Sequence, residues 1–489
     1  MGTITIIGLG PGDGRYVTRE AWSVLESAEN PVYLRTASHP VVAELPCAWR
    51  SFDQSYVDSA DFQSVYAQIV ATILNEAASN DVLYAVPGDP HVGESTTFAI
   101  LEQAKSAEIP VRVIRGLSFY EPMLGAINLD GMEGVQIYDA IMVSEHLHAP
   151  VNPDAPLLLG QLFSRMLASD LKLSLMAVYS PEHPVQLIHG AGTDMLQIEC
   201  VPLHQIDHSE QLGNLTTLYV PRRETVSSIG NFADSVAILR SPDGCPWDQE
   251  QTPQSLRAAL LEESAELIDA IDRDEADDIC DELGDVLLHI VMQAQMASEA
   301  GDFTLADVIA GVDAKIKRRH PHVWGDLKID SIDGLNKTWD AIKVQEKIAA
   351  GKSQPASVLD NIPPALSALA RSQKIQKRAR KVGFDWPSIE GVYAKLAEEI
   401  DELKSAETHA HRTEELGDML FVMGNLALWL GLDAETALRE ANLKFMRRFQ
   451  QVEQLLQARN TTFDRMSFDD LLRVWLEAKA IVSAKEHLM

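Results

Sequence analysis

Acidic side chains recur at helical spacing in the second half of the chain. Residues 262–266 read EESAE and residues 282–285 read ELGD. Because residues three or four apart share one face of a helix, two neighbouring helices could bring together Glu262, Glu263, Glu266, Glu282 and Asp285. Like charges this close repel one another unless some take up protons or a cation lies among them. Several carboxylate oxygens in one place suit Mg²⁺ or Mn²⁺.

The same pattern occurs a second time further along the chain. Residues 398–402 read EEIDE and residues 415–418 read ELGD, offset from the first set by 136 and 133 positions. The matching carboxylates are Glu398, Glu399, Glu402, Glu415 and Asp418. Upstream of each set, GCPW at 244–247 recurs as GFDW at 383–386. Matches in a constant order predict two copies of one helical unit.

Basic and aromatic side chains follow each acidic set in the same order. They are Lys315, Arg318, Trp339 and Lys343 in the first copy, and Lys444, Arg447, Trp475 and Lys479 in the second. Taken singly, each residue type has a structural explanation as a solvated helix face, a surface charge or a core tryptophan. Carboxylates, cations and an aromatic ring that recur together favour a metal-assisted site for nucleotide phosphates.

The helical half resembles the MazG family of nucleoside triphosphate pyrophosphohydrolases. The first copy carries GCPWDQEQT (244–252), LLEESAELIDAI (260–271) and RRHPHVWGD (318–326), and the second carries EEIDEL (398–403), EELGDMLFVMGNLA (414–427) and WLEAK (475–479). The resemblance implies an all-α fold, usually dimeric. It also implies that the chain uses Mg²⁺ to convert a nucleoside triphosphate and water into a nucleoside monophosphate and diphosphate.

By this resemblance, the basic and aromatic residues of a copy would contact the nucleotide. The metal would be held by Glu263, Glu266, Glu282 and Asp285 in the first copy, and by Glu399, Glu402, Glu415 and Asp418 in the second. Glu399, or Glu263 at the matching position of the first copy, would orient the water that attacks the α-phosphorus. Both copies keep the acidic set, so residue identity does not decide which copy is catalytic. The analogy with tandem MazG proteins favours the second copy.

The first 220 residues alternate between strand-like and helix-like segments, which favours an α/β architecture. We expect strands at 3–9, 81–86, 111–114, 140–143 and 173–179, and helices at 62–78 and 97–107. Three loops rich in glycine or proline follow strands: GLGPGD (8–13), PGDP (87–90) and RGLS (115–118). Open α/β sheets bind ligands at such loops. A dinucleotide fingerprint is disfavoured, because Gly12 falls one position early and Pro11 lacks an N–H donor.

Taken in this order, the loops resemble the tetrapyrrole methylase family, which transfers a methyl group from S-adenosylmethionine. The resemblance implies a cofactor pocket lined by Leu9, Asp89, Val92, Ser118 and Phe119. Two positions depart from the family pattern, since a frequent proline is Arg115 here and a paired serine is Phe119. A methylase-like module followed by tandem MazG-like copies is similar to the YabN-type fusion proteins. That likeness implies no particular methyl acceptor.

The composition changes near residue 228, where β-branched runs give way to long helical periodicities. We therefore expect a multidomain chain, with an N-terminal α/β tetrapyrrole methylase-like domain at 1–222. All-α tandem MazG-like helical repeats would follow at 229–350 and 358–489. The stretches 219–228 and 349–364 would link these parts, because both contain turn-forming residues.

The chain carries 72 Asp and Glu against 41 Lys and Arg, a formal net charge of −31. This deficit argues against nonspecific binding to nucleic acid or to an anionic membrane, because both need a positive surface. Four cysteines without a C-x-x-C pair, an N-terminus unlike a signal peptide and no apolar run near ~20 residues predict a cytoplasmic location. The expected partners are nucleoside triphosphates and a second copy of the chain, bound through the helical half.

Three functions are compatible with these features. In the first, the chain is an enzyme that hydrolyses nucleoside triphosphates, fused to a domain that transfers methyl groups from S-adenosylmethionine. In the second, methyl transfer is the main activity and the helical half is ancillary. The third is not enzymatic and joins a ligand-sensing N-terminal half to a dimerisation module.

Overall fold

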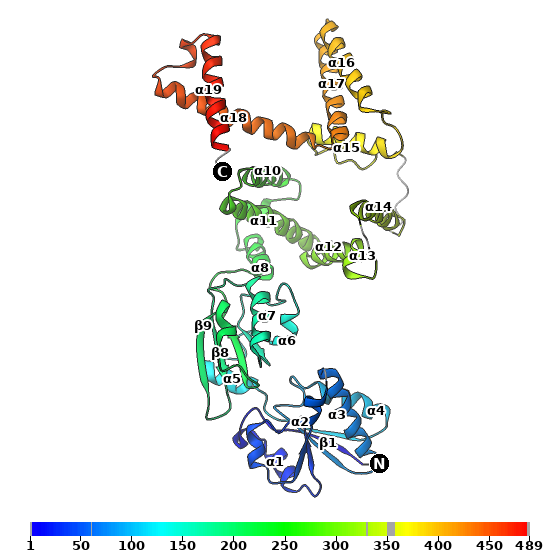
Figure 1. Cartoon of the computed structure of the whole chain (residues 1–489), viewed down its shortest axis with the longest axis vertical. Helices are drawn as coiled ribbons and strands as arrows, with labels where there is room; N and C mark the ends of the chain where they lie inside the picture. The colour runs from blue at the N-terminus through cyan, green and yellow to red at the C-terminus, as the bar shows by residue number, and fades with distance from the viewer. Residues whose placement is uncertain (1, 60, 329–330, 350–356, 487–489) are drawn as a thin grey trace. The chain divides into compact units, whose positions relative to one another are not determined.

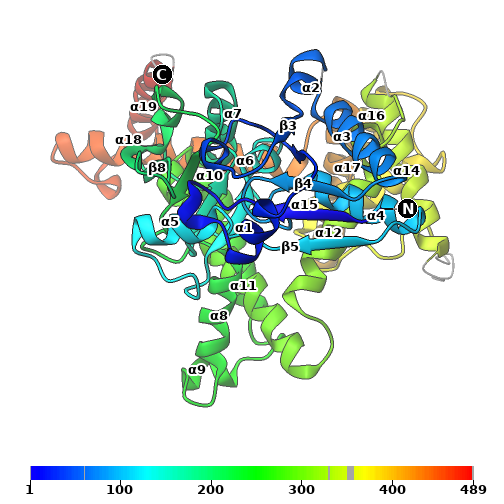
Figure 2. The ribbon, with the colours of Figure 1, turned by 90° about the horizontal axis from the view of Figure 1, so that it is seen from below.

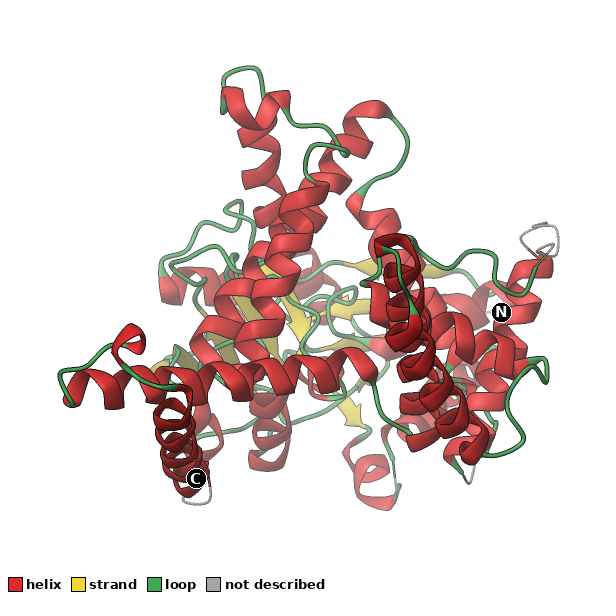
Figure 3. Cartoon of the chain, turned by 90° about the horizontal axis from the view of Figure 1, so that it is seen from above, coloured by secondary structure: helices red, strands yellow, loops and turns green. Residues whose placement is uncertain are grey.

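The computed structural model describes residues 2–59, 61–328, 331–349 and 357–486, which Figure 1 colours from blue to red along the chain. The chain divides into two compact units, Met1–Val312 and Asp313–Met489. Among the described residues, all strands belong to the first unit, and helices build the second (Figure 3). The expected multidomain organisation, an α/β part followed by an all-helical part, is confirmed. The individual domain boundaries stay a prediction.

The first sheet contains five parallel strands in the order β3-β2-β4-β1-β5, and Figure 2 shows β1, β4 and β5 side by side. They are β1 (Ile4–Gly8), β2 (Val32–Leu34), β3 (Trp49–Ser51), β4 (Val82–Val86) and β5 (Val111–Ile114). The strands predicted at 3–9, 81–86 and 111–114 are therefore confirmed, as β1, β4 and β5. Ile6 packs toward α3 (Phe62–Ala77) and α4 (Ser95–Ser106), while Ile7 packs toward α1 (Arg19–Glu26). Because the strands are parallel, the loops that follow them gather at one edge of the sheet.

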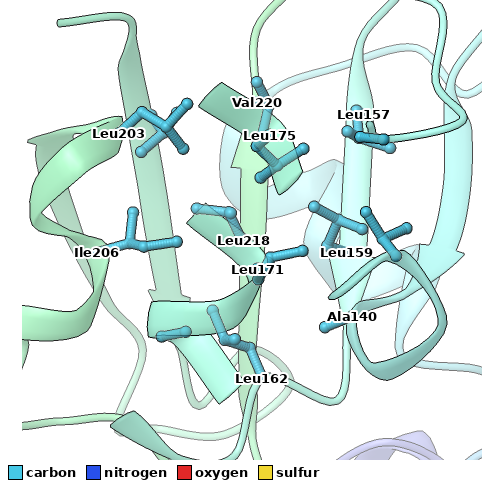
Figure 4. Packing of buried hydrophobic residues seen from close by; sticks show 14 of the residues in the cluster. Ala140, Leu157, Leu159, Leu162, Leu171, Leu175, Leu203, Ile206, Leu218 and Val220 are labelled. Atoms are coloured by element: carbon cyan, nitrogen blue, oxygen red, sulfur yellow. The ribbon is translucent and has the colours of Figure 1, made fainter. Parts of the chain in front are cut away.

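The second sheet has the order β6-β7-β10-β8-β9 and contains parallel and antiparallel pairs. Its strands are β6 (Gln136–Asp139), β7 (Leu157–Gly160), β8 (Pro184–His189), β9 (Gln197–Pro202) and β10 (Thr216–Val220). Helix α7 (Arg165–Met176) covers one face of this sheet. Figure 4 shows its Leu171 and Leu175 beside Leu218 and Val220 of β10, at the centre of the buried core. The short helices α2 (Asp53–Asp58) and α5 (Tyr120–Ile127) follow β3 and β5.

Two predicted strands in this region are wrong. Residues 140–143 lie in helix α6 (Ala140–Ser144), which begins there because the Asp139 carboxylate accepts a hydrogen bond from the N–H of Ile141. Residues 173–179 are the end of α7 and the turn after it. The short apolar run at 173–179 resembles a strand, but a longer window contains the helical stripe of Leu167, Leu171 and Leu175.

The first unit continues into helices after β10. They are α8 (Ile229–Arg240), α9 (Pro246–Glu250), α10 (Arg257–Arg273) and α11 (Ala276–Ala300). The start of α8 is fixed by Asp154, whose carboxylate accepts hydrogen bonds from the N–H groups of Ser227 and Ser228. Helices α10 and α11 are joined by two residues and pack along each other, as the acidic pattern requires.

Helix α12 (Leu305–Arg319) crosses the division between the units. The second unit continues with α13 (Pro321–Trp324), α14 (Ile332–Ala349), α15 (Ala368–Lys381), α16 (Ile389–Ser405), α17 (His409–Leu430), α18 (Ala434–Ala458) and α19 (Phe468–Glu486). Helix α16 packs along α17, and α18 along α19 (Figure 1). Part of the predicted link at 349–364, namely 350–356, lies outside the described residues. No single described helix is apolar over a bilayer-spanning length, although α17 and α18 together pass a test of length and composition with a bend of 103° between them.

Candidate functional site

Three predicted metal ligands of the second copy come together between two helices. Glu399 and Glu402 lie on α16 and Glu415 lies on α17, and one carboxylate oxygen of each is within 4.8 Å of the other two. The spacing of three residues puts Glu399 and Glu402 on one face, and the packing of α16 along α17 brings Glu415 opposite them. Glu399 and Glu415 are 3% and 8% exposed, whereas Glu402 is open to solvent.

Two basic side chains contact the buried carboxylates of this cluster. Lys395 Nζ lies 2.8 Å from Glu399 Oε1, and His411 Nε2 lies 2.8 Å from Glu415 Oε1. Partial desolvation raises the pKa of the Glu402 carboxyl group, and repulsion from Glu415 raises it further. A divalent cation among the three oxygens would remove that repulsion, so the donor set fits a hard ion such as Mg²⁺.

A cavity of about 750 Å³ opens beside the carboxylate cluster. Its walls come from α15, α16, α17 and the turn between α15 and α16. Glu399 and Lys395 line it from α16, and Asp418, the fourth predicted ligand of this copy, lines it from α17. One wall of the cavity therefore carries the groups that a metal ion and phosphate oxygens need.

Aromatic side chains line the same cavity from the turn that precedes α16. Phe384 and Trp386 both belong to the lining, and both are substantially exposed. Gly383 adopts a φ of 86°, a left-handed conformation that permits the sharp turn here. Gly391 leaves room for the indole of Trp386, because a Cβ atom at that position would lie 2.8 Å from Trp386 Cε3. The turn thus offers flat apolar surfaces in the cavity that contains the carboxylates.

Asn425 of α17 adds an acceptor to this cavity. It belongs to the lining, and its Oδ1 is buried without a hydrogen-bond partner among the described residues. Nearby, the Gln376 side chain donates to the carbonyl of Phe421 and fixes α15 against α17. A buried oxygen without a donor is unfavourable. The amino or imino group of a nucleobase would supply that donor.

The matching carboxylates of the first copy also converge. Glu263 and Glu266 on α10 and Glu282 on α11 each offer an oxygen within 4.8 Å of the others. Partial desolvation raises the pKa of Glu282, and repulsion from Glu266 and Asp285 raises it further. Where the second copy has Lys395 and His411, the first has Ala259 and Asp278, so these two basic side chains are absent. This cluster also fits a divalent cation.

The two arginines of the first copy share one carboxylate of their own unit. Glu346 on α14 lies 2.6 Å from Arg318 and 2.7 Å from Arg319, and these hydrogen bonds lower its pKa to about 2. Lys343 Nζ lies over the ring of Trp339, 5.3 Å from its centre. Lys315 is exposed on α12. Much of the predicted nucleotide-binding set of the first copy is thus engaged in contacts within the protein.

The matching residues of the second copy do not line the cavity. Lys444 and Arg447 lie on α18, and Trp475 and Lys479 lie on α19. The ring of Trp475 packs on Phe445, with 5.2 Å between centroids. Trp475 follows Trp339 by 136 positions, and the residue that follows Glu346 by the same offset is the buried Val482. The second copy therefore has no carboxylate at the position of Glu346. The four side chains stay predicted nucleotide contacts.

The three N-terminal loops meet at the carboxyl edge of the first sheet, as expected. Gly10 and Gly88 exchange backbone hydrogen bonds of 3.2 and 2.7 Å. A Cβ atom at Gly116 would lie 2.4 Å from the Gly88 carbonyl oxygen, and one at Gly8 would lie 2.6 Å from the Gly116 nitrogen. The glycines are needed because the three loops approach one another through their backbones.

Two of the five residues predicted for the cofactor pocket, Val92 and Phe119, line a cavity of about 500 Å³ at these loops. The other three lie in the walls behind it. Leu9 is fully buried, and Ser118 donates a hydrogen bond of 2.7 Å to Glu121. Asp89 pairs with Arg115 at 2.7 Å, and although burial opposes the shift, this hydrogen bond lowers the pKa of Asp89. The departure from the family pattern at Arg115 thus has a structural role.

Several cavity residues were not singled out from the sequence. Trp386 could have been, since it belongs to the repeated G-x-x-W pattern, but the base-stacking role was given to Trp475 and Trp339. Arg35 and His39 line the N-terminal cavity and follow β2 without any recognisable motif. Only their three-dimensional surroundings identify them.

Two family models match different parts of the chain. The model of the Tetrapyrrole (Corrin/Porphyrin) Methylases matches residues 3–207. The model of the MazG nucleotide pyrophosphohydrolase domain matches residues 251–324, which contain the first acidic cluster. The α/β part and the first helical copy thus match different families.

Individual relatives extend the likeness over the whole chain. The chain is 35% identical over 489 residues to the uncharacterized protein YabN of Bacillus subtilis, with 98% of each chain covered. It is 45% identical over 251 residues to the nucleoside triphosphate pyrophosphohydrolase/pyrophosphatase MazG of Thermotoga maritima, covering 51% of this chain and 95% of that protein. Among solved structures, uroporphyrin-III-C-methyltransferase of Thermus thermophilus matches with 20% identity and a TM-score of 0.36, covering 45% of this chain and 95% of that one.

Proposed function

Because this chain belongs to the family of fusion proteins that join a tetrapyrrole methylase domain to a MazG nucleotide pyrophosphohydrolase, we propose that its helical half hydrolyses nucleoside triphosphates to monophosphates and diphosphate. The proposal assigns the reaction to the second copy. The observation that carries it is the cavity in which Glu399 and Asp418 lie with Trp386.

The metal would be held by Glu399, Glu402, Glu415 and Asp418. When bound, Mg²⁺ or Mn²⁺ supplies positive charge that offsets the charge on the triphosphate oxygens. Lys395 lines the cavity and is held by Glu399, so its ammonium group can turn to a phosphate oxygen when that carboxylate takes another partner. Phe384 and Trp386 offer their ring faces to the base, and Asn425 Oδ1 accepts a hydrogen bond from a base N–H.

Glu399 is the proposed general base. Its carboxylate orients a water molecule and takes a proton from it as the water oxygen bonds to the α-phosphorus. The bond from this phosphorus to the bridging oxygen breaks at the same time, and diphosphate leaves with that oxygen. General base catalysis of this kind contributes about 10²–10⁴-fold to the rate.

Metal removal tests this function in the wild-type chain. With ATP and Mg²⁺, we expect steady release of diphosphate and AMP. Treatment with EDTA should stop the release, since the uncompensated carboxylates and the triphosphate would repel each other, and added Mg²⁺ or Mn²⁺ should restore it. Release of inorganic phosphate in place of diphosphate, or activity that EDTA leaves unchanged, would contradict the proposal.

A second function is proposed for the N-terminal half, namely methyl transfer from S-adenosylmethionine. The supporting observation is the cavity at the glycine-rich loops, in which Val92 and Phe119 lie. Close backbone approach of the loops leaves room for a ligand beside Gly88. Methyl transfer at this cavity would need no residue of the helical half.

Filling this cavity tests the cofactor proposal. Val92→Trp puts a large ring into the space beside Phe119 and should weaken S-adenosylmethionine binding at least about tenfold, while diphosphate release stays unchanged. Isothermal titration of the full chain measures the affinity. Absence of binding by the wild-type chain, or equal binding by the variant, would refute the proposal.

The helical half is also proposed to form a homodimer. Large apolar side chains recur on the exposed surfaces of α18 and α19, at Leu438, Phe445, Phe449, Phe468, Leu472 and Leu476. Contiguous exposed apolar surface of this kind marks an interaction site. Light scattering should give the mass of two chains, and Leu476→Glu should shift the mass toward one. A monomeric wild-type chain at micromolar concentration would contradict this expectation.

A further inference from the structure

The N-terminal cavity has a wall that the glycine-rich loops do not form. In the sheet order β3-β2-β4-β1-β5, segments that follow β2 and β3 lie on one side of the β4 loop, and those that follow β1 and β5 lie on the other. Pro11 and Phe119 line the cavity from the β1 and β5 side, whereas Arg35 and His39 line it from the β2 side. We call this second wall the β2 end, and it consists of Arg35, Thr36, His39, Asp53, Tyr56 and Tyr66.

Arg35 makes three hydrogen bonds inside the protein. Its Nη1 donates to Glu94 at 2.7 Å, its Nη2 to the hydroxyl of Tyr66 at 3.0 Å and its Nε to the hydroxyl of Tyr56 at 3.1 Å. The Glu94 side chain is 1% exposed, so the ion pair forms a largely buried neutral unit. Among the described residues that line the cavity there is no other Lys or Arg. The positive charge of the β2 end is therefore already balanced by a buried carboxylate.

The carboxylate of the β2 end is also satisfied. Asp53 accepts hydrogen bonds from Thr36 Oγ1 at 2.6 Å and from the N–H of Ala37 at 2.9 Å. A ligand with several carboxylates would bring charges into this wall that have no partner, and unpaired charge is strongly unfavourable in a desolvated site. The β2 end therefore disfavours a tetrapyrrole polycarboxylate.

Aromatic rings provide the apolar surface of this cavity. Phe62, which also lines it, is stacked on Tyr66 with 6.2 Å between centroids and lies edge-on to Tyr56 and Phe163 at 6.3 Å. Phe62 is 50% exposed, so part of its ring is open to a ligand. Aromatic rings favour planar partners, because offset stacking adds to the burial of apolar area.

His39 supplies an unpaired acceptor. It is 8% exposed and lines the cavity. Its Nε2 lies 3.0 Å from the carbonyl oxygen of Gly10, and because a carbonyl can only accept, Nε2 carries the proton. Burial lowers the pKa of His39 to about 4, so the ring is neutral at pH 7. The lone pair of Nδ1 is therefore free, and this atom is buried with no partner in the described chain.

We propose that the β2 end binds a small, uncharged, planar heterocycle of the nucleobase type, which donates an N–H hydrogen bond to His39 Nδ1 and lies against Phe62. The paired Arg35 and the carboxylate of Asp53 select against anions, the rings select a planar ligand, and the free lone pair selects a donor. If the N-terminal half transfers methyl groups, this ligand is the acceptor. The binding does not itself need S-adenosylmethionine, so failure of the cofactor proposal and failure of this inference are distinguishable.

Titration with defined probes tests the inference on the full chain. Hypoxanthine and benzimidazole should each show saturable binding, and uroporphyrin should show none. Binding of hypoxanthine should not require S-adenosylmethionine or S-adenosylhomocysteine. Failure of both heterocycles to bind, or binding of uroporphyrin, would each overturn the inference.

Variants at His39 identify the atom involved. His39→Phe should weaken hypoxanthine binding about tenfold or more, because the acceptor is lost. His39→Asn keeps an acceptor oxygen near the position of Nδ1 and should restore most of the affinity, and the exposed His208→Phe should bind like the wild type. In the wild-type chain labelled with ¹⁵N-histidine, the Nδ1 resonance of His39 should move when hypoxanthine is added. Binding that leaves this resonance unmoved would overturn the assignment without relying on any variant.

Discussion

Replacing Glu402 by Gln and Asp418 by Asn together should lower the rate of diphosphate release from ATP by about a hundredfold or more. Two of the four proposed metal ligands lose their charge, and metal stabilisation of several kcal/mol corresponds to a factor of this size. Both side chains are exposed, so amides of the same shape should leave the fold unchanged. A steady-state assay of the purified full chain measures the rate, and a melting curve checks the fold.

The matched control is the same double change in the first copy, Glu266→Gln with Asp285→Asn. These positions correspond to Glu402 and Asp418, and both are exposed as well. We expect the control to keep the wild-type rate within about threefold, because the proposal assigns the reaction to the cavity beside the carboxylates of the second copy. If instead the control loses activity and the second-copy variant keeps it, the reaction belongs to the first copy.

Arg35→Met should destabilise the N-terminal half by about 3–5 kcal/mol. The substitution leaves the Glu94 carboxylate, 1% exposed and now without its 2.7 Å partner, buried as an unpaired charge. Hydrogen exchange of the amides in β2 and β4 measures the effect locally, which suits a multidomain chain that does not unfold in one step. Their exchange should become roughly a hundredfold faster or more, at about 1.4 kcal/mol for each factor of ten.

Arg112→Met provides the control for this change. Arg112 pairs with Glu20 at the same distance of 2.7 Å, but both side chains are more than half exposed. An exposed pair of this kind contributes less than about 1 kcal/mol, so exchange of the same amides should barely change. Equal effects of the two substitutions would mean that Glu94 is not buried as described.

The acidic site was accessible from the sequence because its geometry is mostly local. Glu399 and Glu402 share a helix face through their spacing alone, and the short link between α16 and α17 brings Glu415 to them. The internal repeat added independent support, since both copies show the same convergence. The glycine-rich loops were predictable for a similar reason, because the carboxyl ends of parallel strands lie at one edge of the sheet.

Contacts between residues distant in the sequence could not be predicted in this way. The Arg35–Glu94 pair joins residues 59 positions apart, and the Arg319–Glu346 pair joins residues 27 apart. Neither pair belongs to a recognisable sequence motif, because each depends on how the intervening segments pack. The wrong strands at 140–143 and 173–179 have a local cause, since apolar runs this short do not distinguish strands from helices.

The relation of the helical half to nucleoside triphosphate pyrophosphohydrolases argues against the non-enzymatic alternative. The nucleotide contacts of Lys444, Arg447, Trp475 and Lys479 and the cytoplasmic location stay predictions. The order of the two halves, an α/β part that resembles methylases and a duplicated helical part, agrees with the relative that spans the whole chain.

Hydrolysis of ATP in ¹⁸O-labelled water with Mg²⁺ is the most direct test of the central claim. If the water attacks the α-phosphorus in the helical half, the label should appear in AMP and the released diphosphate should carry none. Label in diphosphate or in inorganic phosphate, or no hydrolysis at all, would contradict the account.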